Sequence, residues 1–397
     1  MQTDTIVARL LRCCAPLMHA ARWQALCDVT TSAVFGKPLT LTGLALGTRR
    51  VISLRHRIKC VDRLLANDHL AHERFDAYRA LAHQWLSDLP QMLIVVDWSS
   101  LSADLQWHWL RASVVVDGRS ITLYEEVHAR QQLAAFQVHQ RFVKRLAALL
   151  PPSQRPPIIL TDAGFRTTWF RLIAAEGWYW VGRTRNRDFV RHIGGEWHCH
   201  LYGGFAAKDL YARATGEASD LGDYEAVRNR PLTCRFALIK MKPAGRQRKY
   251  PSGKVTNNSS ARKIAQRSCP LLGNREPWLL SYSPELSYLG ANAIIKLYGQ
   301  RIPKRGQVKI EQQFRDTKNL GLGMGLSQSK SAGQPRLQAL LLIAHIAALT
   351  KRLIGEAAKA QQMALQLISN HNLKRDDISD DARYTCDRAR RLARQNH

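Results

Sequence analysis

The sequence predicts a mixed α/β protein, and three observations support this fold class. The chain has 397 residues, of which 45% are hydrophobic and 23% are charged, so it can bury a large core. Helical periodicity in the N-terminal part gives way near residue 91 to apolar runs typical of strands. Strand and helix patterns then follow in the order βββαβαβ, which indicates a mixed sheet.

Residues 1–88 have the three- and four-residue apolar spacing of helices. Basic side chains surround the apolar positions of one part of this segment: Arg49, Arg50, Arg55, His56, Arg57, Lys59 and Arg63. Such a pattern is typical either of a solvated helix face or of a surface that binds DNA phosphates. We expect a helical DNA-binding domain over residues 1–88.

The central region has the pattern of three strands, over residues 92–97, 107–117 and 120–127. Asp117-Gly118 is a hairpin signal, so the three strands are expected to be antiparallel. The following elements are a helix over 131–150, a strand over 157–162, a helix over 165–176 and a strand over 178–184.

Residues 186–275 break this rhythm with glycine pairs and short alternating stretches, which predicts a β-rich insertion. Its very basic loop, 242–263, is either a solvated loop or a contact to the phosphate backbone. The chain then continues with a strand over 278–283 and helices over 286–300, 308–319 and 335–362.

The charge of the chain indicates a polyanionic partner. Lys and Arg number 59 against 31 Asp and Glu, a formal net charge of +28. Nucleic acid is the commonest such partner, and an anionic membrane surface is the rival. The longest apolar run, 337–349, is shorter than the roughly 20 residues that cross a bilayer, and the N-terminus has no signal-peptide pattern. We therefore expect a cytoplasmic protein with no membrane partner.

Carboxylates follow two of the apolar runs. Asp97 and Asp162 each end a predicted buried strand, where an acid is usually functional. Two neighbouring carboxylates repel, so a metal ion is expected to neutralise them, and Mg²⁺ prefers oxygen ligands. The alternative is that each aspartate caps the turn or helix that follows it.

A third carboxylate lies on the predicted helix 308–319. Glu311, Phe314, Arg315 and Lys318 follow the i, i+3, i+4, i+7 spacing and share one face. An acid beside two cations fits a site that holds both a metal ion and phosphate. An ordinary surface salt-bridge face would show the same spacing.

Four motifs occur in order along the chain: VVDWS at 95–99, ILTDAGFR at 159–166, YGQR at 298–301 and EQQFRDTK at 311–318. This pattern resembles the DDE transposases of bacterial insertion sequences, particularly the insertion-sequence-four family and its insertion-sequence-ten branch. The resemblance spans about residues 91–350. It implies a ribonuclease-H-like catalytic core over 89–185 and 276–335, interrupted by the β-rich insertion, with a helical C-terminal region over 336–397 that could serve dimerisation.

The resemblance also implies the site residues. Asp97, Asp162 and Glu311 would be catalytic and would bind two Mg²⁺ ions, with Mn²⁺ as a substitute. The residues expected to bind DNA are Tyr298, Arg301, Arg315, Lys318 and Trp98. For Trp98, stacking on a displaced base is one interpretation, and a core tryptophan is the other.

The activity implied by the resemblance is cut-and-paste transposition, in which phosphodiester bonds at the terminal inverted repeats are cleaved and the freed 3′ ends are joined to target DNA. The expected partner is double-stranded DNA, bound by a homodimer in the bacterial nucleoid. Two other functions stay open: a catalytically silent DNA-binding relative, and a ribonuclease-H-like nuclease that does not join strands.

The spacing of the last two motifs departs from the family. Nine residues separate Arg301 from Glu311, six more than the family pattern has. In a continuous helix these extra residues would turn Glu311 through roughly 240°. We therefore expect Pro303 and Gly306 to break the helix, so that the extra residues loop out.

Overall fold

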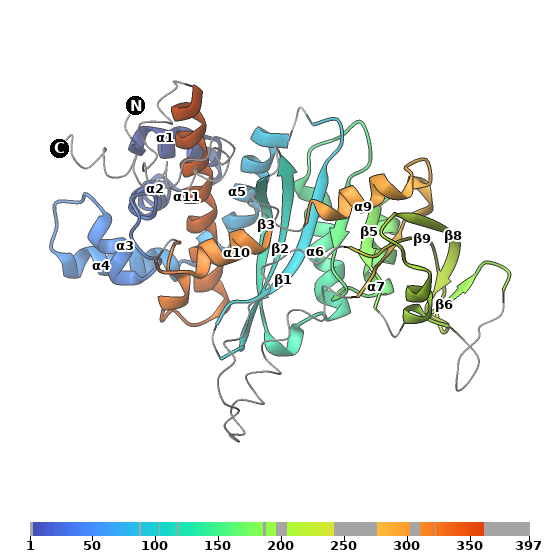
Figure 1. Cartoon of the computed structure of the whole chain (residues 1–397). Helices are drawn as coiled ribbons and strands as arrows, with labels where there is room; N and C mark the ends of the chain where they lie inside the picture. Colours follow the sequence, from blue (N-terminus) through green and yellow to red (C-terminus); the bar gives the residue numbers. More distant parts are fainter. Residues whose placement is uncertain are drawn as a thin grey trace, which may run out of the picture. The chain divides into compact units, whose positions relative to one another are not determined.

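The computed structural model describes residues 3–86, 89–102, 104–116, 119–185, 188–195, 205–241, 276–301, 310–321 and 323–360. The chain is a mixed α/β protein, which confirms the predicted fold class at this level (Figure 1). Packing divides it into two compact units: a first unit of Met1–Ile158 with Gln300–His397, and a second unit of Ile159–Gly299. The five segments expected from the sequence are a different division of the chain and stay predictions.

The first unit begins with the helices that the sequence predicts. They are α1 (Thr3–Leu10), a 3₁₀ turn (Leu11–Leu17), α2 (Ala20–Val34), α3 (Leu41–Gly47), α4 (Leu54–Leu65) and α5 (Asp68–Leu86). Side chains cap several of them. The hydroxyl of Thr40 accepts a bond from the N–H of Gly43 at the start of α3, and Ser53 caps α4 in the same way.

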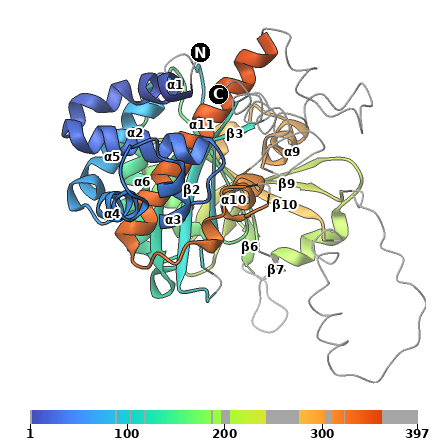
Figure 2. The ribbon, with the colours of Figure 1, turned by 90° about the vertical axis from the view of Figure 1, so that its left-hand side faces the viewer.

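The C-terminal helix α11 (Gln334–Ala360) packs against α1, α2, α4 and α5, as Figure 2 also shows. Its residues Leu340–Ile343 are fully buried. Among the described helices, α11 is long and apolar enough to span a bilayer, but 67% of its most apolar window is buried inside the protein. The helix therefore serves as a core element of the first unit.

Three antiparallel strands follow the N-terminal helices: β1 (Leu93–Ser100), β2 (Trp107–Val116) and β3 (Arg119–Ala129), with β2 in the middle. This confirms the predicted antiparallel arrangement, while Asp117-Gly118 lies outside the described residues. The expected end of β1 at Asp97 is wrong. Trp98, Ser99 and Ser100 continue the pairing with β2, so Asp97 lies inside the strand.

The helix predicted from residue 131 begins later. Arg130–Gln132 forms a 3₁₀ turn, Ala134 has a positive φ of 57°, and α6 spans Phe136–Leu149. A non-glycine residue in the left-handed region cannot continue a right-handed helix, which explains the delayed start. After α6 the chain returns to the sheet, where the N–H of Ile158 donates to the carbonyl of Met92 at 2.9 Å.

The second unit takes over the chain within β4 (Ile158–Thr161), of which Ile158 still belongs to the first unit. It then contains α7 (Thr167–Ala175), β5 (Tyr179–Arg183), β6 (Phe189–His192), β7 (Phe205–Ala206), β8 (Ser219–Ala226), β9 (Leu232–Ile239), β10 (Trp278–Tyr282) and α9 (Ala291–Gly299). Antiparallel pairs link β5, β10, β9, β8, β6 and β7 in that order. The described part of 186–275 is thus rich in strands. The predicted phosphate-contacting loop, 242–263, lies outside the described residues.

The helix predicted from residue 286 also begins later. Pro284–Leu286 forms a 3₁₀ turn, and α9 spans Ala291–Gly299. The next described helix, α10, spans Ile310–Lys318, so the two motif-bearing segments lie on separate helices as predicted. Pro303 and Gly306, expected to break the helix, lie outside the described residues.

Because two histidines are buried, we expect the free energy of unfolding to fall at acidic pH. Burial, followed by the charge of Arg111, lowers the pKa of His345 to about 3, and burial lowers that of His139 to about 4. The unfolded chain therefore binds more protons than the folded chain as pH falls from about 6.5 towards 4, so stability is lost across that window.

We expect each histidine to cost about 2 kcal/mol between pH 7 and pH 5. The free energy of unfolding from urea titrations at both pH values measures this loss. In His345→Leu, which keeps a similar volume, the loss should shrink by about 2 kcal/mol. An unchanged difference between the two pH values would contradict the assignment.

Candidate functional site

Asp97 lies on β1 with a nearly buried carboxylate, whose side chain is 10% exposed. Arg301, which is 204 residues away in sequence, donates from Nη2 to Oδ2 of Asp97 at 2.7 Å. The backbone N–H of Trp98 donates to Oδ1 at 2.9 Å. Because a buried carboxylate is costly without a counter-ion, the guanidinium of Arg301 offsets part of the cost of burying Asp97.

Helix α10 lies beside the three strands (Figure 1) and bonds to them through Gln313 and its last residue, Lys318. The Nζ atom of Lys318 donates to Ser99 Oγ at 2.8 Å and to the carbonyl of Ser100 at 2.9 Å. The side chain of Gln313 donates to the carbonyl of Ser120 on β3. Burial, followed by the charge of Arg111, lowers the pKa of Lys318.

The four residues predicted to share one face of α10 differ in how exposed their side chains are. Phe314 is buried, Lys318 is half-buried, and both Glu311 and Arg315 are exposed. Residues seven positions apart lie on the same side of a helix, so Glu311 and Lys318 share a side. Since Lys318 reaches β1, Glu311 is expected on the side of α10 that is turned towards that strand.

Asp162 and Tyr298 belong to the second unit. Asp162 directly follows β4, as predicted, and its Oδ1 accepts a bond from the N–H of Gly164 at 2.8 Å. This is a local turn, whereas Arg166 occupies the N-cap of α7. Tyr298 is buried on α9 with its ring edge-on to Trp278, at 5.3 Å. The meeting of Asp162 and Tyr298 with the site residues of the first unit stays a prediction.

Trp98 points away from the Asp97 face, because successive residues of a strand alternate between faces. Its indole Nε1 donates to Nε2 of His139 on α6 at 3.1 Å. Its ring also packs edge-on against His128, with 5.6 Å between centroids. These contacts agree with the core interpretation of Trp98, and base stacking stays a prediction.

A buried polar network on the same face of the sheet as Asp97 was not among the sequence predictions. Glu125 on β3 is fully buried and accepts bonds from Arg111 Nε, Trp109 Nε1 and the hydroxyl of Tyr78, at 2.7–2.8 Å. The carbonyl of Glu125 accepts a further bond from Arg74 at 2.6 Å. Two adjacent glutamates inside an otherwise apolar strand pattern, SITLYEEV, were the available signal.

The next glutamate points to the other face of the same strand. Glu126 accepts bonds from the hydroxyl of Tyr124 at 2.7 Å and from Arg145 at 2.6 Å, and lies 2.9 Å from Nε2 of His128. Burial raises the pKa of Glu126, but the bonds from His128 and Arg145 outweigh it and lower that pKa to about 2. Both glutamates are thus buried with cationic partners.

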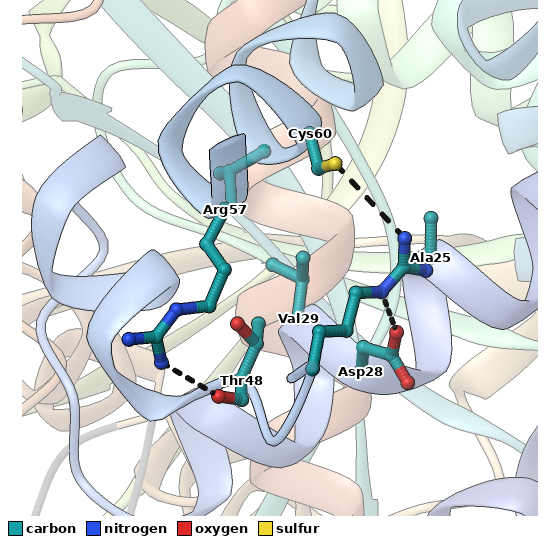
Figure 3. Close-up of a pocket in the computed structure, with 8 residues that line it drawn as sticks. Ala25, Asp28, Val29, Thr48, Arg57 and Cys60 are labelled. Carbon is teal, nitrogen blue, oxygen red and sulfur yellow. Dashed lines mark hydrogen bonds and ion pairs between the residues drawn. The ribbon is translucent and has the colours of Figure 1, made fainter. Parts of the chain in front are cut away.

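Part of the predicted basic surface points inward. Arg50 Nε donates to Asp28 at 2.6 Å, and Arg57 Nη1 donates to the carbonyl of Thr48 at 3.1 Å. These residues line a small pocket between α2 and α4 (Figure 3). Arg50 also approaches Cys60 there, with Nη1 4.0 Å from Sγ. Arg50 therefore links α2 to α4, and Arg57 fixes α4 to the end of α3.

The outer face of α4 carries a basic stripe, which we define as Arg55, Lys59 and Arg63. All three side chains are exposed, and their i, i+4, i+8 spacing aligns them along one face of the helix. Lys and Arg side chains aligned along one face of a helix are typical of surfaces that contact a nucleic-acid backbone. The stripe is a candidate nucleic-acid interface.

The predicted metal ligands are all oxygen donors, which is the set that Mg²⁺ prefers. Within the described ranges, no three His, Cys, Asp or Glu side chains gather closely enough to form a metal site.

No family profile matches the chain, and no curated protein is similar to it in sequence.

The Asp97–Arg301 pair predicts a coupled effect on stability. Asp97→Asn removes the carboxylate that the buried guanidinium of Arg301 contacts, so we expect a loss of about 3 kcal/mol in the free energy of unfolding. Arg301→Gln should lose a similar amount. The double variant should recover about 1–3 kcal/mol relative to the sum of the single losses, as urea unfolding would measure. Strictly additive losses would contradict a direct pair.

Proposed function

We propose that the protein is a DDE-type DNA transposase, which cleaves and joins DNA phosphodiester bonds with Mg²⁺. One observation carries the proposal. Arg301 and Lys318 both bond to β1 within three residues of Asp97, although they lie more than 200 residues further along the chain. The motifs VVDWS, YGQR and EQQFRDTK, which suggested this activity, thus contribute to one face of one strand.

The carboxylates suit the metal ions that the activity requires. Asp97, Asp162 and Glu311 would hold two Mg²⁺ ions, or Mn²⁺, because carboxylate oxygens are hard ligands and both Glu311 and the end of β4 carry them near the surface. When bound, the ions would activate the attacking water or DNA 3′-hydroxyl and stabilise the leaving oxygen.

The cations of this region have separate tasks in the proposal. Lys318 is fixed by Ser99 and Ser100, so it would hold a phosphate with little loss of side-chain entropy. Arg315 is exposed on α10 and would contact DNA from that helix. Arg301 neutralises Asp97 in the protein without DNA and would share its charge with a bound phosphate.

The partner in the proposal is double-stranded DNA. The net charge of +28 and the basic stripe on α4 support an interaction with phosphate backbones. Joining two ends of an element in one complex would need two copies of the chain, so we propose a homodimer on DNA. A nucleoid-associated, cytoplasmic location follows from this partner.

One observation favours a second candidate function, that of a catalytically silent DNA-binding relative. The carboxylate of Asp97 is paired with Arg301, and the segment between Arg301 and Glu311 is longer than in the family pattern. An inactive protein that still binds the element's ends would support this second function. The following experiment separates the two.

The proposed activity predicts Mg²⁺-dependent cleavage of duplexes that carry the inverted repeats flanking the gene. Asp97→Ala, Asp162→Ala and Glu311→Ala should each lower the cleavage rate at least about 100-fold, since each removes a metal ligand. Binding of the same duplex, measured by gel shift, should persist.

Glu285→Ala, which removes an exposed acid from the second unit, is the matched control and should cleave at the wild-type rate. Wild-type activity in any one of the three ligand variants would refute that residue's role. A wild-type protein that binds but never cleaves in Mg²⁺ or Mn²⁺ would refute the proposed activity.

The basic stripe predicts a change in the salt dependence of DNA binding. Replacing Arg55, Lys59 and Arg63 by Gln should reduce the slope of log K against log salt by about 3, or nearly one for each lost phosphate contact. Fluorescence anisotropy with labelled duplex between 50 and 200 mM salt measures this slope. Gln at Lys208, Arg228 and Lys330, which are also exposed, removes the same charge and should change the slope by less than one.

A further inference from the structure

A row of alternating charges crosses the three strands of the first unit. Asp97 on β1 is the register partner of Arg111 on β2, which is in turn the register partner of Glu125 on β3. Directly opposite residues point to the same face of a sheet, with about 5 Å between their Cβ atoms. Arg301 extends the row beyond Asp97. The row lies on the face that α10 covers.

Arg111 is held in this row with little freedom. It is 2% exposed, and its Nε donates to Oε2 of Glu125 at 2.8 Å. The same carboxylate accepts bonds from Trp109 and Tyr78, so three donors fix its position. Because the position of the carboxylate is fixed, the planar guanidinium of Arg111 can bond to it in one orientation.

The other side of Arg111 contacts α10. Its guanidinium carbon lies 3.9 Å from the ring centroid of Trp109 and 5.0 Å from that of Phe314. The rings of Trp109 and Phe314 meet edge-on at 4.8 Å. Phe314 is three residues after Glu311 and four before Lys318, so the contact lies between the two polar side chains that α10 contributes to the site.

An apolar side chain would fill this space at lower desolvation cost, because a buried ion pair is rarely worth more than the hydrophobic contacts it replaces. The charge of Arg111 is therefore better explained by what it faces. Asp97 lies opposite in register, and Lys318 lies close enough for Arg111 to lower its pKa. One buried cation thus lies opposite an acid of β1 in the strand register and lowers the pKa of an amine of α10.

We propose that Arg111, anchored by Glu125, is a positioning residue that holds Phe314 of α10 against β2 and so keeps Lys318 beside the strand that carries Asp97. The inference rests on the proposed function only where it concerns catalysis. Arg111 would not touch DNA, because it is buried between the strands and α10.

Acetylation of the Lys318 amine by acetic anhydride, followed against pH by peptide mass spectrometry, tests the arrangement without DNA. In Arg111→Met the midpoint should rise towards that of an ordinary lysine, because a nearby positive charge is lost while the burial of the amine remains. Arg111→Lys keeps the charge and should restore the midpoint. Arg145→Met, which removes the arginine partner of Glu126 on the opposite face, should leave it unchanged.

An unchanged midpoint in Arg111→Met, or an equal rise in Arg145→Met, would overturn the inference. If Arg111→Met does not fold, Phe314→Leu keeps the Glu125–Arg111 pair and removes the ring contact. It should speed acetylation of Lys318 about threefold or more, and an unchanged rate would equally overturn the inference.

Cleavage kinetics give the second test. Arg111→Met should lower kcat about tenfold with KM for DNA nearly unchanged, and Arg111→Lys should recover part of the loss. A change in KM alone would contradict a positioning role. An inactive wild-type enzyme would refute the proposed transposase activity, and the acetylation result would then decide the role of Arg111 by itself.

Discussion

The first unit depends on the requirement that every buried charge has a partner. Asp97 is paired with Arg301, Glu125 with Arg111, and Glu126 with Arg145 on the opposite face. Each of these pairs joins different elements, and the first spans 204 residues of sequence. A buried charge that lacks such a partner raises the free energy of the folded state. The pairs therefore restrict how the strands and helices can be arranged.

The distribution of these pairs over the two faces of β3 separates two environments. Glu125 faces the side with Asp97 and α10, whereas Glu126 faces the side with Trp98 and α6. Alternation along a strand makes this separation automatic once the register is fixed. Of the two glutamates, Glu125 therefore shares the face of the sheet on which the proposed catalytic site lies, and Glu126 does not.

Elements with a strong local pattern were predictable, and those decided by backbone geometry were not. The three strands and their antiparallel order follow from alternating apolar residues. The delayed start of α6 depends on the left-handed backbone of Ala134, which has no signal in an alanine. The extension of β1 through Ser100 was missed because Ser99 and Ser100 are poor strand formers, and only their pairing with β2 makes them part of the sheet.

The site shows the same limit for contacts over long distances. Asp97, Arg301 and Lys318 were predicted from motifs. Asp97 lies on β1, and the side chains of Arg301 and Lys318 both bond to that strand, which is consistent with the prediction. Arg111 and Glu125 belong to no motif, and their pairing depends on cross-strand register together with a helix 200 residues away. A pattern within one segment cannot report a partner that another segment supplies.

The packing of α11 has a consequence for biosynthesis. This last described helix covers α1, α2, α4 and α5, so the N-terminal helices keep apolar faces uncovered until the ribosome has made residues beyond 334. With translation at roughly 5–20 residues per second, that interval lasts tens of seconds, during which the nascent chain needs a chaperone or some other cover. Premature termination before α11 would leave a fragment prone to aggregate, so only chains that include α11 would accumulate as folded protein.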